Sequence, residues 1–178
     1  MDTIIEEGFT RLTETIAELG ERRGTLETEI LSDLSGLLEK MASLATPLVG
    51  TLGNQFLERS KQDAKGELYD TVHYEKKMIV IGRAEEPVHY RPDDPKKSVQ
   101  KQFCLLTEDG VLAELMYSDD GFIIDSYLNL LTPGEAIDLY GPELLFMLYR
   151  ALHDYGNLQE ELVVALDTTL AFIQQKEE

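Results

Sequence analysis

Apolar residues in the first 46 positions recur at alternating spacings of four and three, the pattern of a helix with one apolar row along its length. The phase holds for nearly four heptads, and Arg23 occupies one position of the row. We predict a long, coiled-coil-like helix over residues 3–46. Its row consists of Ile5, Phe9, Leu12, Ile16, Leu19, Leu26 and Ile30.

Two glycines leave a second interpretation of this segment open. Gly20 and Gly24 each cost about 1 kcal/mol inside a helix and could instead form the loop of a helical hairpin. The constant phase from Leu19 to Leu26 favours one helix, because a loop has no reason to preserve it. Pro47 and the glycines that follow it predict the end of the helix.

The central part of the chain has the alternation and turn signals of β-strands. Asp109-Gly110 and Asp120-Gly121 separate three β-rich stretches and are typical of hairpins. Weaker candidate strands precede them at 68–74, 77–83 and 87–91. We therefore predict an antiparallel meander of five or six strands.

The C-terminal part returns to helical spacing. Gly141-Pro142-Glu143 places proline at a first helical position, and Gly156-Asn157 can split the helix in two. The predicted fold class is α+β, with long terminal helices flanking the sheet. Its segments are an N-terminal long helix or helical hairpin (1–48), a linker that can hold a short helix (49–66), an antiparallel β-sheet (67–132) and a C-terminal helix or helix pair (133–178).

The lengths of these segments predict self-association. A helix of about 40 residues is about 60 Å long, more than a sheet of about 60 residues can cover. The rest of its row must meet the C-terminal helix or a second copy of the chain, so we predict a homodimer or higher homo-oligomer. Arg23 would help to set the register. The predicted interface residues are Phe9, Leu12, Ile16, Leu19, Leu26, Ile30, Leu162, Leu166 and Ile173.

Charge and composition narrow the classes of partner. The net charge of −18 argues against a nucleic-acid partner, which requires clustered Lys and Arg. The single cysteine, Cys104, excludes an internal disulfide and every cysteine-based zinc site within one chain. No run approaches 18 apolar residues, so we expect no membrane span, no signal peptide and a cytoplasmic location.

Two of the three histidines share the tripeptide Val-His-Tyr, at His73 and His89. In the simplest meander they share a face but lie roughly 16 Å apart, too far for a common metal ion within one chain. A site across a dimer axis is the arrangement that could still use them. We otherwise expect half-exposed strand residues.

Two acids form the other candidate pair. Two-residue hairpin turns would place Glu114 opposite Asp125, where like charges persist if they bind a metal or share a proton. Three-residue loops with a bulged glycine would place Glu114 opposite Ser126 instead, and the sequence favours these. Cys104 lies in an apolar run, which predicts a buried and inert thiol.

Phosphate-binding loops, nucleophile elbows and paired zinc-binding histidines are all missing from the sequence. The leading hypothesis is a non-enzymatic, oligomeric interaction or adaptor protein, with a chaperone-like role as one form of it and no bound cofactor. The alternative is a small-molecule or metal site on the sheet, with or without enzymatic activity. It would use His73, His89, Glu114 or Asp125.

Overall fold

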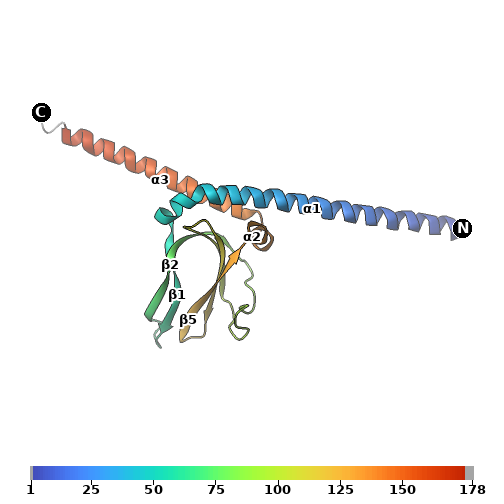
Figure 1. Ribbon diagram of the computed structural model, residues 1–178, viewed down its shortest axis with the longest axis horizontal. Coiled ribbons are helices and arrows are strands. Elements are labelled where there is room, and N and C mark those ends of the chain that lie inside the picture. Colours follow the sequence, from blue (N-terminus) through green and yellow to red (C-terminus); the bar gives the residue numbers. More distant parts are fainter. Residues whose placement is uncertain (1, 175–178) are drawn as a thin grey trace.

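The computed structural model describes the backbone of residues 2–174 and the side chains of residues 6–174 (Figure 1). It is an α+β fold in which helices at both ends flank a closed antiparallel barrel. The elements in chain order are α1 (Asp2–Leu52), β1 (Asn54–Gln62), β2 (Leu68–Arg83), β3 (Lys101–Thr107), β4 (Leu112–Asp119), β5 (Ile123–Leu131), α2 (Pro133–Tyr140) and α3 (Glu143–Gln174).

Helix α1 is continuous over 51 residues, about 76 Å, which confirms the single helix and excludes the hairpin. The expectation that Pro47 ends it was wrong: the helix passes through Pro47 and continues to Leu52. Proline keeps a helical φ, and the lost bond to the Ser43 carbonyl and the ring's clash with that carbonyl are confined to the last turns of the helix. The chain leaves the helix at Gly53, where a Cβ would lie 2.6 Å from the Val49 carbonyl oxygen.

The sheet is a five-stranded barrel closed by pairing of β1 with β5, not an open meander. The short helix predicted within residues 49–66 is absent, and β1 occupies its place. Its Glu, Arg, Lys and Gln residues favour a helix locally, but pairing with both β2 and β5 satisfies the backbone on each side. Tertiary pairing therefore overrides local propensity here.

Strand β2 replaces two predicted strands. Residues 68–74 and 77–83 form one 16-residue strand, since Glu75-Lys76 lacks the residues that a tight turn requires. The third predicted strand, 87–91, lies in an irregular connection, where Tyr90 makes one isolated bridge to Ser98.

The two hairpins differ. Thr107 donates its amide to the Val111 carbonyl, and Gly110 has φ +81°, which confirms the three-residue bulged loop. At the second hairpin the Asp120 amide donates to the Ile123 carbonyl, so the loop is Gly121-Phe122. Both predicted registers of Glu114 were therefore wrong, and it pairs with Asn129.

Alternate residues of the strands enter two apolar clusters. One cluster draws on all five strands and fills the barrel, around the buried Met78, Leu105 and Leu115. The other lies on the outer face, where Ile81, Cys104 and Leu106 pack against the helices. The helical layer crosses the barrel at one end (Figure 1).

The C-terminal segment holds two helices, but the break differs from the predicted one. Helix α2 begins with a capping box between Thr132 and Glu135 and ends at Gly141, whose φ is +80°. Helix α3 then runs without interruption through Gly156-Asn157. Leu144 and Leu148 anchor its first half in the outer cluster.

Gly82 of β2 lies where the barrel meets α3. A Cβ there would lie 2.4 Å from Leu144 Cδ2 and 3.3 Å from Cys104 Cβ. We expect Gly82→Ala to lower the free energy of unfolding by about 1–3 kcal/mol, measured by urea denaturation. Gly36→Ala is the control, because nothing lies within 4 Å of its Cβ position and alanine favours the helix, so stability should rise by about 0.5–1 kcal/mol.

Candidate functional site

The first half of α1 extends from the barrel as an arm, residues 6–30, in which every side chain is exposed. The predicted row lies here. We use "α1 row" for Phe9, Leu12, Ile16, Leu19, Leu26 and Ile30, which are 47–68% exposed. Ile5, the first residue of the predicted row, has a side chain outside the described residues.

Further along α1, a second set of apolar residues faces the barrel. Leu38, Ala42, Ala45 and Val49 are buried in the outer cluster. One residue before two of these positions, Leu37 and Leu44 keep the phase of the α1 row and remain 49% and 78% exposed. The shift in apolar spacing therefore marks where the helix begins to contact the barrel.

The second half of α3 forms another arm, residues 153–174. Its predicted interface residues Leu162, Leu166 and Ile173 are about half exposed, as are Leu158 and Leu170. These five residues are the "α3 row". The two arms project from the barrel on opposite sides, with the N-terminal end of α1 and the C-terminal end of α3 far apart (Figure 1).

The two histidines of the repeated tripeptide lie on different parts of the fold. His73 pairs with Leu57 across β1 and β2, whereas His89 lies in the β2–β3 connection. The shared face predicted for them was wrong, because His89 is not on a strand. Within the described part of the chain, no group of three or more His, Cys, Asp or Glu could hold a metal ion.

Glu114 is a buried carboxylate beneath the helical layer, 4% exposed. It accepts hydrogen bonds from the Tyr140 hydroxyl at 2.8 Å and from Gln102 Nε2 at 2.6 Å. Burial and this carboxylate raise the pKa of the Tyr140 hydroxyl, which therefore stays protonated and keeps donating. The network ties α2 to the barrel wall. Burial likewise raises the pKa of the Cys104 thiol to about 12, which agrees with an inert residue.

Asp125 lies in a different cluster, on the outer face of β5. Arg91 donates to it at 2.7 Å from Nη1 and to Asp93 at 2.8 Å from Nε, and Lys97 also pairs with Asp125. The hydrogen bond from the Arg91 guanidinium lowers the pKa of the Asp93 carboxyl. Arg91 is 6% exposed and stacks over Tyr127, so this cluster fixes the β2–β3 connection to the barrel.

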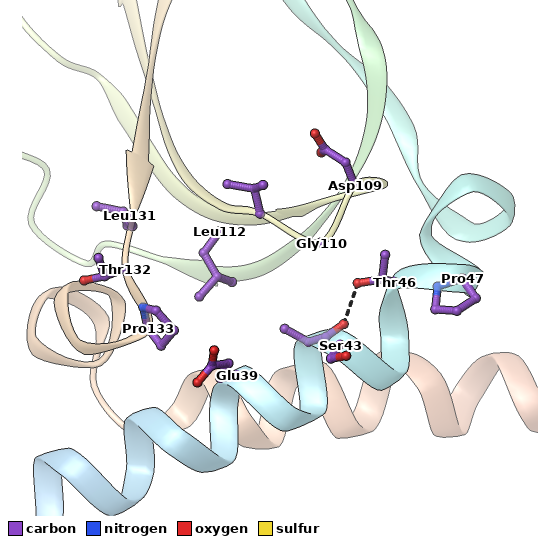
Figure 2. Close-up of a pocket in the computed structure, with 12 residues that line it drawn as sticks. Glu39, Ser43, Thr46, Pro47, Asp109, Gly110, Leu112, Leu131, Thr132 and Pro133 are labelled. Carbon is purple, nitrogen blue, oxygen red and sulfur yellow. Dashed lines mark hydrogen bonds between the residues drawn. The ribbon is translucent and has the colours of Figure 1, made fainter.

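A pocket of about 610 Å³ lies between α1 and the barrel (Figure 2). Leu112 and Leu131 contribute apolar surface, and Glu39 contributes a carboxylate from α1. Asp109 lies at the edge but is already paired with Lys76. The lining holds no histidine, cysteine or lysine. Two of its hydroxyls serve the helices: Thr46 donates to the Ala42 carbonyl and Thr132 donates to Glu135.

Comparison with known proteins adds no function: no protein-family model, curated protein or solved structure matches the chain. No helix of the described residues has the length and apolarity needed to cross a membrane.

The residues predicted as chemical candidates therefore lie in separate places on the fold, whereas each of the two exposed apolar rows runs along one helix. Sequence reasoning missed the Arg91 cluster and the burial of Glu114, although the apolar neighbours of Glu114 in LAELMYSD were a signal.

Proposed function

We propose that this protein is a non-enzymatic, self-associating interaction protein, an adaptor whose helical arms join copies of the chain and whose barrels face outward toward a protein partner. A chaperone-like role belongs to this class. The observation that carries the proposal is the α1 row, which keeps its heptad spacing from Ile30 out to Phe9, beyond the last contact of α1 with the outer cluster, while staying about half exposed.

An arm of this kind needs a partner to be stable. Most of the stability of a helix in a protein comes from packing of its apolar face, which this arm lacks within one chain, and Gly8, Gly20 and Gly24 weaken the arm further. Covering the row would supply the missing stabilisation, at roughly 25 cal/mol per Å² of apolar surface buried. A second copy of the chain offers a matching row at equal concentration.

Charge works against this association, so the apolar rows must drive it. Residues 1–50 carry ten acids and four bases, a net charge of −6, and residues 134–178 carry nine acids and two bases, a net charge of −7. Added salt screens such repulsion over a Debye length of about 10 Å at 0.1 M. Association should therefore strengthen as salt is added, opposite to the behaviour of an interface held by ion pairs.

We also propose a cytoplasmic location, consistent with a buried free thiol.

Light scattering coupled to size-exclusion chromatography tests the proposal. We expect a mass of two chains, about twice the 20.1 kDa of one, at micromolar concentration, and tighter association at 0.5 M than at 0.05 M NaCl. A monomer at both salt concentrations would contradict it.

A further inference from the structure

The two arms are matched in length. The last residues that pack against the outer cluster are Leu31 on α1 and Leu152 on α3. The α1 row runs outward from Ile30 to Phe9 and the α3 helix runs outward from Leu152 to Ile173, and these two stretches contain the same number of residues. At about 1.5 Å per residue each spans about 32 Å.

We propose that each α1 arm pairs antiparallel with the α3 arm of a second copy, an inference that rests on the proposed self-association. The chain runs toward the barrel in α1 and away from it in α3, and the arms leave the barrel in opposite directions (Figure 1). A two-fold axis that is perpendicular to the arms and passes between the two copies therefore places each α1 arm beside the partner's α3 arm. Both arm pairs form at once and the assembly closes as a dimer.

The spacing of apolar residues suits this pairing. Counted outward from the barrel, each residue of the α1 row has a large apolar side chain of helix α3 at a closely similar depth, within about one residue. The resulting layers are Leu26 with Tyr155, Leu19 with Leu162, Ile16 with Leu166, Leu12 with Leu170, and Phe9 with Ile173.

Arg22 and Arg23 favour the same partner. In a parallel, in-register pair of α1 arms, Arg23 would lie against its own copy, a repulsive contact at the centre of the interface. Opposite the α3 arm, Arg23 lies close to the depth of Leu158, with Glu160 and Glu161 within one turn. The one basic pair of the α1 arm near its row thus meets the one adjacent pair of acids in the α3 arm.

The buried area also distinguishes the pairing of α1 arms with α3 arms from the pairing of two α1 arms. A half-exposed Leu, Ile or Phe offers on the order of 70 Å² of apolar surface. Two α1–α3 arm pairs would bury roughly 1,500 Å², within the range of stable interfaces. A pair of α1 arms alone would bury roughly 800 Å², the size of a lattice contact, and would leave both α3 rows exposed.

Disulfide trapping with two introduced cysteines tests the pairing in the full-length chain. Ile16→Cys with Leu166→Cys places both thiols at the same depth, because Ile16 is as far from Ile30 along the chain as Leu166 is from Leu152. The matched control, Leu26→Cys with Leu166→Cys, offsets the thiols by about 15 Å along the arm. Opposite directions of the arms prevent a bond within one chain (Figure 1), and the native thiol of Cys104 is buried.

We expect mild oxidation to link the first variant into a dimer at least tenfold faster than the control, with a 16–166 bond identified by peptide mapping. Faster linking of the control, with a ladder of larger species, would overturn the inference in favour of a parallel, open chain of copies. Complete linking of Ile16→Cys alone would overturn it in favour of paired α1 arms and leave the proposed function standing. A monomeric mass before oxidation would overturn both.

Discussion

A chain carrying Leu12→Asp and Leu19→Asp is expected to be a 20.1 kDa monomer at concentrations where we expect the wild-type chain to be a dimer. Both residues lie in the middle of the α1 row and are more than half exposed in the single chain. Each substitution removes apolar contact from the interface and places a carboxylate where water is excluded. We expect the dissociation constant to rise by at least about 10³-fold, equivalent to about 4 kcal/mol.

The same variant should retain its barrel, because neither side chain belongs to the two apolar clusters. Phe122→Asp is the matched control: it removes a large apolar side chain that is 75% exposed at the β4–β5 turn, away from both arms. Sedimentation equilibrium over a concentration series gives the three dissociation constants. Equal values for wild type and the double variant would show that the α1 row is not the interface.

Asp125→Asn is expected to lower the free energy of unfolding by about 2–3 kcal/mol, the second large effect. The substitution removes the charge that pairs with Arg91 and Lys97, and Arg91 is nearly fully buried. Arg91 keeps Asp93 as a partner, which places the loss below that of a fully uncompensated buried charge. Urea denaturation at pH 7 measures the difference.

Asp70→Asn is the control for this cluster, because the Lys61–Asp70 pair is exposed and its loss should change stability by less than about 0.5 kcal/mol. The pH dependence of the free energy of unfolding gives a second check on the role of this cluster. Since Arg91 depresses the pKa of Asp93 below its ordinary value of 3.8, the stabilisation from Asp93 is present above that pH and is lost as the pH falls through the folded-state pKa. An unchanged urea midpoint for Asp125→Asn at pH 7 would contradict the role given to the cluster.

The sequence predicted the helices better than the sheet, for physical reasons that particular residues illustrate. Heptad spacing from Phe9 to Ile30 is a local signal, and it outweighed Gly20 and Gly24 because the phase never slipped. Barrel closure has no local signal, because Arg59 of β1 pairs with Asp125 of β5, at the other end of the sheet sequence. The strand β1 itself consists largely of residues that favour helix.

Turn chemistry explains the wrong register of the second hairpin. Asp119 and Asp120 looked like loop residues, but β4 includes Asp119, and the side chain of Asp120 accepts from the amides of Phe122 and Ile123. This capping moves the loop to Gly121-Phe122 and shifts every pair along β4 and β5. The same shift separates Glu114 from both residues that the sequence had placed opposite it.

The candidate site, like the fold, could be predicted from the sequence only in part. Exposure of the α1 and α3 rows follows from spacing and helix length, which a single sequence contains. The burial of Glu114 depends on Tyr140 and Gln102, brought together by the docking of α2 on the barrel. Such contacts between distant segments have no counterpart in local patterns.

Hydrogen exchange of the two arms tests the central claim, that a second copy covers the rows, most directly. At tens of micromolar we expect backbone amides of residues 9–30 and 155–173 to be protected by at least about 10²-fold, and to lose that protection on dilution below the dissociation constant while the barrel strands keep theirs. An uncovered helix of this length frays on the microsecond timescale and gives little protection. Arms that exchange at the rate of an isolated helix at every concentration would contradict the account.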